Sequence, residues 1–301
     1  MFVFIIPFIV IRILYSLYRK FILTAVPVKD KIVLVTGASS GLGEACAKKF
    51  AEEGAKVILC ARNVVELKRV KKEISGDENS KWPVVYSMDI TQKKDIDNCI
   101  QEIESNHCFV DILISNAGVS LRGTVIDTDI EVHRKMMEVN YFGPVNLVKA
   151  VLPSMLSRRT GHIVSIGSLQ AVVAIPYRCA YASSKHASQA FFDSLRAEVC
   201  GEGINISTIN PGYIRTNLSK NAFTPDGEKH GVMDKTTASG MPPEYVAECV
   251  YDCVYKPRND LLLCGFFNGL GPMTRHCCPP LYHWYMARKG RKEAEMYKKK
   301  T

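Results

Sequence analysis

The stretch Lys31-Ile-Val-Leu-Val-Thr-Gly-Ala-Ser-Ser-Gly-Leu-Gly43 is the most informative part of this 301-residue chain. It begins with a run of apolar, mostly β-branched residues, which is typical of a buried strand, and it ends in three closely spaced glycines. A helical pattern then covers residues 44–53, and a second strand covers residues 56–60. This order predicts a dinucleotide-binding site, because glycines let backbone N–H groups approach a pyrophosphate at the helix N-terminus.

The same alternation continues along the chain. Helices are expected at residues 64–74, 93–105, 130–156 and 181–200, and strands at residues 84–87, 111–115, 162–166, 205–209 and 260–264. Parallel strands joined by helices bind ligands at the carboxyl ends of the strands. We therefore expect an α/β fold: a single Rossmann-type, doubly wound, mostly parallel seven-stranded sheet with helices on both faces. It occupies residues 29–270, between an N-terminal hydrophobic anchor with a basic flank at residues 1–28 and a basic, aromatic tail at residues 271–301.

The positive charge lies at the two ends of the chain. Of a net charge of +9, residues 1–20 carry +3 and residues 288–301 carry +5. A nucleic-acid-binding protein would show a basic face across its folded body, so we expect no nucleic acid as a partner; basic ends beside apolar residues indicate a membrane surface. The 11 cysteines form no CxxC pair and no zinc-like cluster with His, so we expect no metal.

The first residues form an apolar segment. Residues 2–18 contain a single charged residue, Arg12, and reach the lower length limit of a spanning helix. Basic residues follow this segment and none precedes it, so the positive-inside rule places the catalytic domain in the cytosol. A cleaved signal peptide, which would place the protein in the secretory lumen or outside the cell, is the alternative.

The other end of the chain also suggests a membrane. Residues 281–292 mix aromatic and basic side chains, as an interfacial helix does; a solvated basic tail is the alternative. The last four residues, Lys298-Lys-Lys-Thr301, resemble the dilysine retrieval signal of endoplasmic reticulum membrane proteins. The endoplasmic reticulum is therefore the favoured location, with the peroxisome as a second candidate.

Tyr181 and Lys185 stand four residues apart in a predicted helix, and Tyr181 follows Ser168 by thirteen residues. Side chains at this spacing lie on one face of a helix. An ammonium beside a phenol stabilises the phenolate and lowers a pKa that starts near ~10. Such a phenol exchanges protons near neutral pH. A Tyr-x-x-x-Lys pair arises often by chance, and it gains meaning here from the glycine motif.

Together these motifs resemble the short-chain dehydrogenase/reductase family. The resemblance covers roughly residues 29–263 and rests on Thr36-Gly37-x-x-x-Gly41-x-Gly43, Ser115-Asn-Ala-Gly118, Asn140, Ser168, Tyr181-x-x-x-Lys185 and Pro211-Gly212. Ser115 departs from the usual second Asn of the family, and Gln170 stands where relatives often have Gly. The stretches at residues 140–144 and 184–193 are most similar to a membrane-associated group within the family.

The resemblance implies four catalytic residues. Tyr181 is the general acid in reduction and the general base in oxidation, and Lys185 lowers the pKa of Tyr181 and holds the nicotinamide ribose. Ser168 donates a hydrogen bond to the substrate oxygen, so the substrate contacts Ser168 and Tyr181. Asn140 binds a water that links Lys185 to solvent.

The end of the second strand indicates which cofactor is bound. Ala61 stands where family members that use NAD carry Asp, and Arg62 follows it. An arginine suits the 2′-phosphate of NADP, so NADP(H) is favoured and NAD(H) is the alternative. The cofactor contacts that the resemblance implies are Thr36, Gly37, Ser39, Ser40, Gly41, Leu42, Gly43, Arg62, Asp89, Ile90, Asn116, Ala117, Gly118, Tyr181, Lys185, Pro211, Gly212, Ile214 and Thr216.

These inferences predict an NADPH-dependent oxidoreductase that interconverts a carbonyl and an alcohol on an apolar, lipid-like small molecule. The resemblance implies a retinoid, a steroid or an acyl/alkyl dihydroxyacetone-phosphate as substrate, residues 216–243 as the substrate loop, and a homodimer. An NAD-dependent alcohol dehydrogenase of the same family is one alternative. A catalytically idle, cofactor-binding membrane scaffold is the other.

Overall fold

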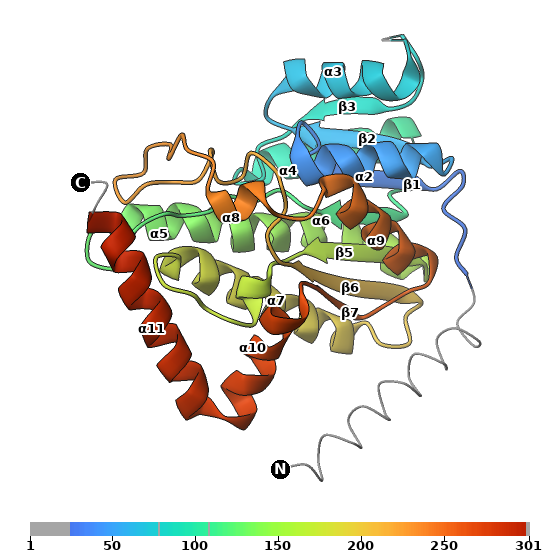
Figure 1. Ribbon diagram of the computed structural model, residues 1–301. Helices are drawn as coiled ribbons and strands as arrows, with labels where there is room; N and C mark the ends of the chain where they lie inside the picture. Colours follow the sequence, from blue (N-terminus) through green and yellow to red (C-terminus); the bar gives the residue numbers. More distant parts are fainter. Residues whose placement is uncertain (1–24, 78, 108, 299–301) are drawn as a thin grey trace.

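A computed structural model describes residues 25–77, 79–107 and 109–298. Seven strands form one sheet in the order β3-β2-β1-β4-β5-β6-β7, and each neighbouring pair is parallel (Figure 1). The strands are β1 (Ile32–Thr36), β2 (Lys56–Ala61), β3 (Val84–Ser87), β4 (Ile112–Ser115), β5 (Gly161–Ile166), β6 (Ile204–Pro211) and β7 (Asp260–Leu263). The predicted Rossmann-type fold is confirmed, and all of its strand pairs are parallel.

Helices cover both faces of the sheet (Figure 1). One face carries α2 (Gly41–Glu52), α3 (Val64–Ser75) and α9 (Pro243–Tyr255), and the other carries α4 (Lys93–His107), α6 (Gly143–Arg158) and α7 (Cys179–Glu198). Each face buries its own apolar cluster, with Phe50 fully buried in the first and Phe192 in the second. β1 is buried along its whole length and is apolar up to Thr36, because it lies between two other strands with helices on both sides.

The long helix expected at residues 130–156 contains an irregularity. α5 (Ile130–Met137) passes through a π-helical turn at Glu138–Phe142 before α6 begins. Single π-helical turns inside α-helices occur frequently at functional sites. Asn140, a predicted catalytic residue, lies in this turn.

The chain after β6 forms two structures beside the sheet. The predicted substrate loop contains a short helix, α8 (Lys235–Ala238), and is held by β-bridges between Leu121 and Phe223 and between Ile214 and Met241. After β7, α10 (Phe266–Cys277) and α11 (Pro279–Lys298) form a helical hairpin whose turn projects from the body of the protein (Figure 1). α10 runs across residue 270, where we expected the tail to begin.

The expected N-terminal anchor at residues 1–28 lies almost wholly outside the described residues. Within residues 25–77, 79–107 and 109–298, no helix has both the length and the apolar character needed to cross a membrane.

Candidate active site

A cleft of about 1260 Å³ lies at the carboxyl ends of the strands. Ser168, Tyr181 and Lys185 line it, and so does every predicted cofactor contact except Gly43. Its walls also include the substrate loop and the α10–α11 hairpin. The fold therefore brings residues from most of the chain to a single site.

The glycine turn after β1 forms a cradle made of backbone. Gly37 has φ +66°, a left-handed conformation that favours glycine. A Cβ on Gly43 would stand 2.2 Å from the Gly37 carbonyl oxygen, so Gly43 supports the turn from behind instead of lining the cleft. Thr36 Oγ1 accepts hydrogen bonds from the backbone N–H groups of Asn116 (3.0 Å) and Ala117 (3.1 Å). These bonds fix the ends of β1 and β4 beside each other.

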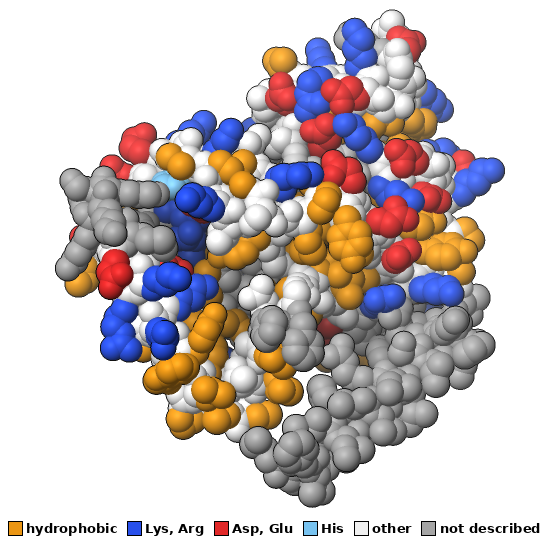
Figure 2. All heavy atoms as spheres, in the orientation of Figure 1, with side chains coloured by type: hydrophobic (Ala, Val, Ile, Leu, Met, Phe, Trp, Pro, Cys, Tyr) orange, Lys and Arg blue, Asp and Glu red, His pale blue; other side chains and the backbone are white. Residues whose placement is uncertain are grey.

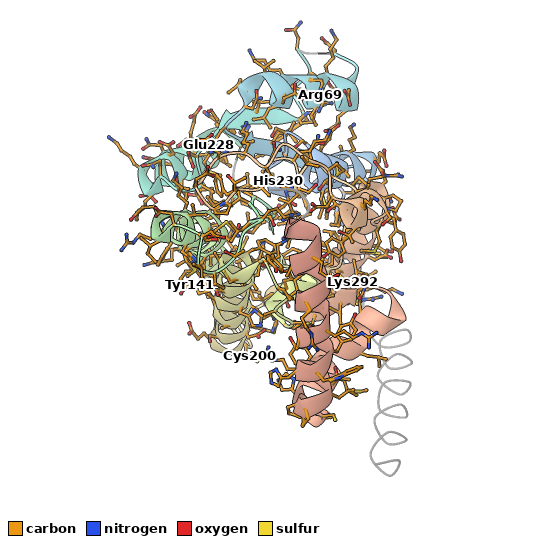
Figure 3. All side chains as sticks on the ribbon, turned by 60° about the vertical axis from the view of Figure 1, so that its left-hand side comes forward. Arg69, Tyr141, Cys200, Glu228, His230 and Lys292 are labelled. Carbon is orange, nitrogen blue, oxygen red and sulfur yellow. The ribbon has the colours of Figure 1, made fainter. Side chains whose placement is uncertain are left out.

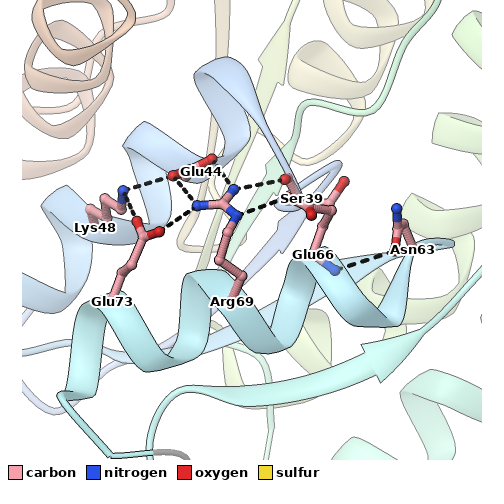
Figure 4. A network of polar contacts seen from close by, with 7 residues as sticks. All are labelled: Ser39, Glu44, Lys48, Asn63, Glu66, Arg69 and Glu73. Atoms are coloured by element: carbon pink, nitrogen blue, oxygen red, sulfur yellow. Dashed lines mark hydrogen bonds and ion pairs between the residues drawn. The ribbon is translucent and has the colours of Figure 1, made fainter.

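An ionic network braces the same turn from the outside (Figure 4). Arg69 of α3 donates to Glu44 of α2 (Nη2–Oε2, 2.8 Å), and its Nη2 lies 3.5 Å from the Ser39 carbonyl oxygen. Lys48 donates to the same Glu44 carboxylate at 2.7 Å. Burial alone would raise the pKa of Glu44, but the hydrogen bonds from Arg69 and Lys48 outweigh it and hold this pKa below its ordinary value. The network fastens α2, α3 and the glycine turn into one unit.

The predicted proton-transfer groups meet in the cleft. Ser168 follows β5 at the start of a 3₁₀ turn (Leu169–Ala171), where its Oγ accepts from Gln170 N–H (3.1 Å). The Ser168 side chain lies close enough to the Tyr181 hydroxyl to lower the pKa of Tyr181. Tyr181 and Lys185 lie on α7 and are both buried. Lys185 Nζ donates to the Ile166 carbonyl oxygen at 3.0 Å, which uses one of its three N–H donors.

Burial shifts the pKa values of Tyr181 and Lys185 in directions that their spacing in the sequence did not predict. It raises the pKa of Tyr181 above its ordinary value, and the hydrogen bond with Ser168 and the charges of Arg122 and Arg178 offset this only in part. It also lowers the pKa of Lys185 to about 8. The net shift of the Tyr181 pKa is upward, because the loss of solvent outweighs the neighbouring charges. The predicted lowering by Lys185 stays a prediction.

Asn140 braces the site from the layer behind the cleft. It is almost fully buried, and its Oδ1 accepts from Val119 N–H at 2.9 Å. Its Nδ2 donates to the Val119 carbonyl (3.0 Å) and to Ser184 Oγ (2.9 Å). Its amide thus joins the segment after β4 to α7, the helix of Tyr181. The water that we expected on Asn140 stays a prediction.

A charged cluster at the substrate end was not predicted. Arg122 is 6% exposed, and its Nε donates to Asp234 Oδ2 at 2.6 Å. Arg178 Nη2 lies 3.6 Å from the same oxygen, and His230 Nε2 lies 3.7 Å from Asp234 Oδ1. Figure 3 shows His230 in the loop beyond the upper end of α11. Because Asp234 belongs to the substrate loop, the cluster fastens this loop beside Tyr181.

The position of one member of this cluster could have been predicted from the sequence. Arg178 precedes Tyr181 by three residues at the N-terminus of α7, so its position on the same face was readable. Arg122 offered no such signal, because a single arginine in a loop is usually exposed. Its partner Asp234 lies 112 residues away in the chain.

Breaking this cluster is expected to loosen the substrate loop. Asp234→Asn should lower kcat/KM about 10- to 100-fold, since a hydrogen bond to a charged group contributes about 1.5–3 kcal/mol. Faster cleavage of residues 216–242 in limited proteolysis would show the loosened loop. Asp226→Asn is the matched control, because this exposed aspartate lies in the same loop and bonds within it, to Thr224. Equal kinetics for both variants would contradict the role of the cluster.

The cleft fits a nicotinamide dinucleotide. Ser40 precedes α2 without capping it by a side-chain hydrogen bond, so the first N–H groups of this helix face the cradle. Lys185 presents an ammonium to the cleft. Gln170 Oε1 is buried, lines the cleft region, and has no hydrogen-bond partner among the described residues, so it offers an acceptor to a ligand. A dinucleotide cradle next to linked Ser, Tyr and Lys side chains defines an oxidoreductase site.

Comparison with known proteins leads to the same class. The short chain dehydrogenase family pattern matches residues 31–227. Dehydrogenase/reductase SDR family member 7B of Mus musculus is 46% identical over 284 residues, covering 93% of this chain and 88% of its own. A solved short-chain dehydrogenase from Streptomyces avermitilis is 28% identical with a TM-score of 0.73, covering 87% of this chain and 98% of its own. A solved serine dehydrogenase complexed with NADP⁺ is 30% identical with a TM-score of 0.70, covering 77% and 94%.

The chain belongs to the short-chain dehydrogenase/reductase family and is a dehydrogenase/reductase enzyme. The resemblance to one group within the family is confirmed, since curated relatives that match most of the chain are members 7B.

Proposed function

We propose that this enzyme uses NADPH to reduce the carbonyl group of an apolar, lipid-like molecule. The observation that carries the proposal is that Ser168, Tyr181 and Lys185 line one cleft, which is walled on one side by apolar and aromatic side chains of α11. Those side chains are Leu281, Tyr282, Trp284, Tyr285 and Met286.

The shifted pKa of Tyr181 supports the direction of reduction. A reduced nicotinamide, when bound, supplies the hydride. The raised pKa keeps the phenol of Tyr181 protonated at neutral pH, so that it donates its proton to the substrate oxygen as a general acid. Ser168 donates a hydrogen bond to the same oxygen while negative charge grows there. An alcohol dehydrogenase would need the phenolate instead, which burial disfavours.

The surroundings of Arg62 support NADPH over NADH. Arg62 is exposed at the end of β2 and lines the cleft. Glu66 is an acid in the same part of the cleft, but Arg69 donates to it at 2.8 Å. An NAD site uses a free acid to accept from the ribose hydroxyls. The arginine is therefore better placed to bind a 2′-phosphate than Glu66 is to bind a ribose.

Removing Arg62 tests this preference. Arg62→Ala is expected to raise the KM for NADPH about 10- to 100-fold, because charge-assisted hydrogen bonds to a phosphate contribute about 1.5–3 kcal/mol. The KM for NADH should stay the same, and Arg62→Lys should recover part of the loss through its remaining charge. Steady-state kinetics with both cofactors measure this. Equal losses with NADPH and NADH would contradict a 2′-phosphate contact.

The chemistry of the cleft narrows the substrate class. The apolar wall suits any of the three expected lipids: a retinoid, a steroid or an acyl/alkyl dihydroxyacetone-phosphate. Arg122 and Arg178 line the same cleft and share one carboxylate, Asp234. Two arginines in the lining of the cleft favour the phosphate-bearing class. Incubating the purified enzyme and NADPH with each lipid tests the proposal; cofactor binding without turnover of any lipid carbonyl would favour the idle scaffold.

A further inference from the structure

The turn of the α10–α11 hairpin exposes apolar side chains. Leu281, Trp284 and Tyr285 are 51%, 56% and 55% exposed, and Met273 on α10 is 43% exposed. Residues 275–281, which include Cys277, Cys278 and two prolines, are all exposed. Figure 2 shows hydrophobic side chains gathered at the lower end of the molecule, where this turn lies. Aromatic residues that leave half of their surface in water are typical of interfaces.

The inner side of the hairpin is held by the segment between Ser168 and Tyr181. Tyr282 is buried, and its hydroxyl donates to the Ala174 carbonyl at 3.1 Å. A Cβ on Gly271 would stand 3.3 Å from Val173, which shows how closely α10 approaches this segment. The apolar face is thus presented outward by a hairpin that is packed against the active site.

The exposed face is continuous with the cleft. Leu281, Trp284 and Tyr285 are half exposed, and the same three side chains line the cleft. A molecule that crosses this face therefore meets an apolar path toward the Ser168–Tyr181 pair.

Basic side chains flank the apolar face. The Arg288 guanidinium lies 5.9 Å from the centre of the Trp284 ring, and Arg275 begins the exposed turn. Arg291 and Lys292 are exposed further along α11, and Figure 3 shows Lys292 on this helix above its apolar end. Aromatic residues at the tip with lysine and arginine behind them match the layering of a bilayer interface, where the basic groups meet anionic lipid head groups.

We propose that the turn of the α10–α11 hairpin docks on a lipid bilayer that contains anionic lipids, and that the apolar substrate enters the cleft from this bilayer past Leu281, Trp284 and Tyr285. The docking does not depend on the proposed function. The path of the substrate does rest on the proposed function.

Trp284 provides a direct readout, because the chain has two tryptophans and the other, Trp82, packs against His107. In full-length Trp82→Phe protein, vesicles of phosphatidylcholine and phosphatidylserine should shift the Trp284 emission to shorter wavelength. Acyl chains brominated near the head group should quench it. Adding Leu281→Asp should abolish both effects, whereas Ile126→Asp, at a 95% exposed site between β4 and α5, should leave them intact. The same protein without residues 1–20 shows whether the hairpin docks without the predicted anchor.

The outcomes separate the possible occupants of this face. Emission that stays at its value in water, without quenching, overturns the docking. A shift that depends on protein concentration in the absence of vesicles overturns it in favour of a second copy of this chain. For the path of the substrate, Met273→Asp, on the exposed face of α10 but outside the lining of the cleft, should raise the KM for a vesicle-borne lipid carbonyl about tenfold, without raising that for a short water-soluble carbonyl. If Trp284 is quenched but no lipid is reduced, the docking stands and the proposed function fails.

Discussion

Replacing Tyr181 by Phe is expected to lower kcat for carbonyl reduction by about 10²–10⁴, which is the usual contribution of a positioned general acid. The change removes one oxygen from a buried ring and keeps the packing of α7. The lost hydroxyl is the acidic group that lies beside Ser168 in the cleft. The loss should therefore fall on kcat, while the dissociation constant for NADPH changes little.

The measurement pairs initial rates with cofactor titration. Tyr213→Phe is the matched control, because Tyr213 is another phenol that lines the cleft and is close enough to Tyr181 to influence its pKa. This control should keep most of the activity. If Tyr181→Phe keeps more than a tenth of wild-type turnover, the proton comes from elsewhere and the assignment is wrong.

The parts of this site that were predictable from sequence are those with a local signal. The glycine turn follows from Gly37 and Gly43, whose conformation and close contacts tolerate no side chain. The order of strands and helices follows from runs of buried residues such as β1, and the Tyr181–Lys185 pair follows from helical spacing. In each of these cases residues near in sequence fix the structure, so the pattern alone carries the information.

The remainder depends on contacts between distant segments. The Arg122–Asp234 pair joins two loops, and the α10–α11 hairpin is held at the cleft by packing against Val173 and Ala174. The direction of the Tyr181 pKa shift depends on burial, which spacing does not report. The π-helical turn at Asn140 inserts no break in the apolar pattern, so a continuous helix was expected there.

Replacing Lys185 by Met is expected to destroy activity and to stabilise the fold. Activity should fall about 10²–10⁴-fold, because the ammonium that would bind the nicotinamide ribose is lost and each such charged hydrogen bond contributes about 1.5–3 kcal/mol. The gain in stability arises because burial lowers the pKa of Lys185 to about 8. Keeping this lysine protonated in the fold at pH 7 costs roughly 3 kcal/mol, which Met avoids. The loss of the hydrogen bond from Lys185 to the Ile166 carbonyl offsets about 1 kcal/mol of this gain in stability.

The pH dependence of the free energy of unfolding distinguishes this electrostatic explanation from a gain in stability that comes only from the apolar side chain of Met. Between pH 8 and the ordinary lysine value near ~10.4, the unfolded chain binds a proton at Lys185 that the folded protein has released. The free energy of unfolding of the wild type therefore rises with pH in this window, relative to Lys185→Met. The advantage of the variant should be largest at pH 7 and should shrink by roughly 2–3 kcal/mol at pH 10. Urea unfolding at several pH values measures it, with Lys149→Met as control at an exposed lysine of α6. An advantage that does not change with pH would mean that Lys185 is not held in the fold at a lowered pKa.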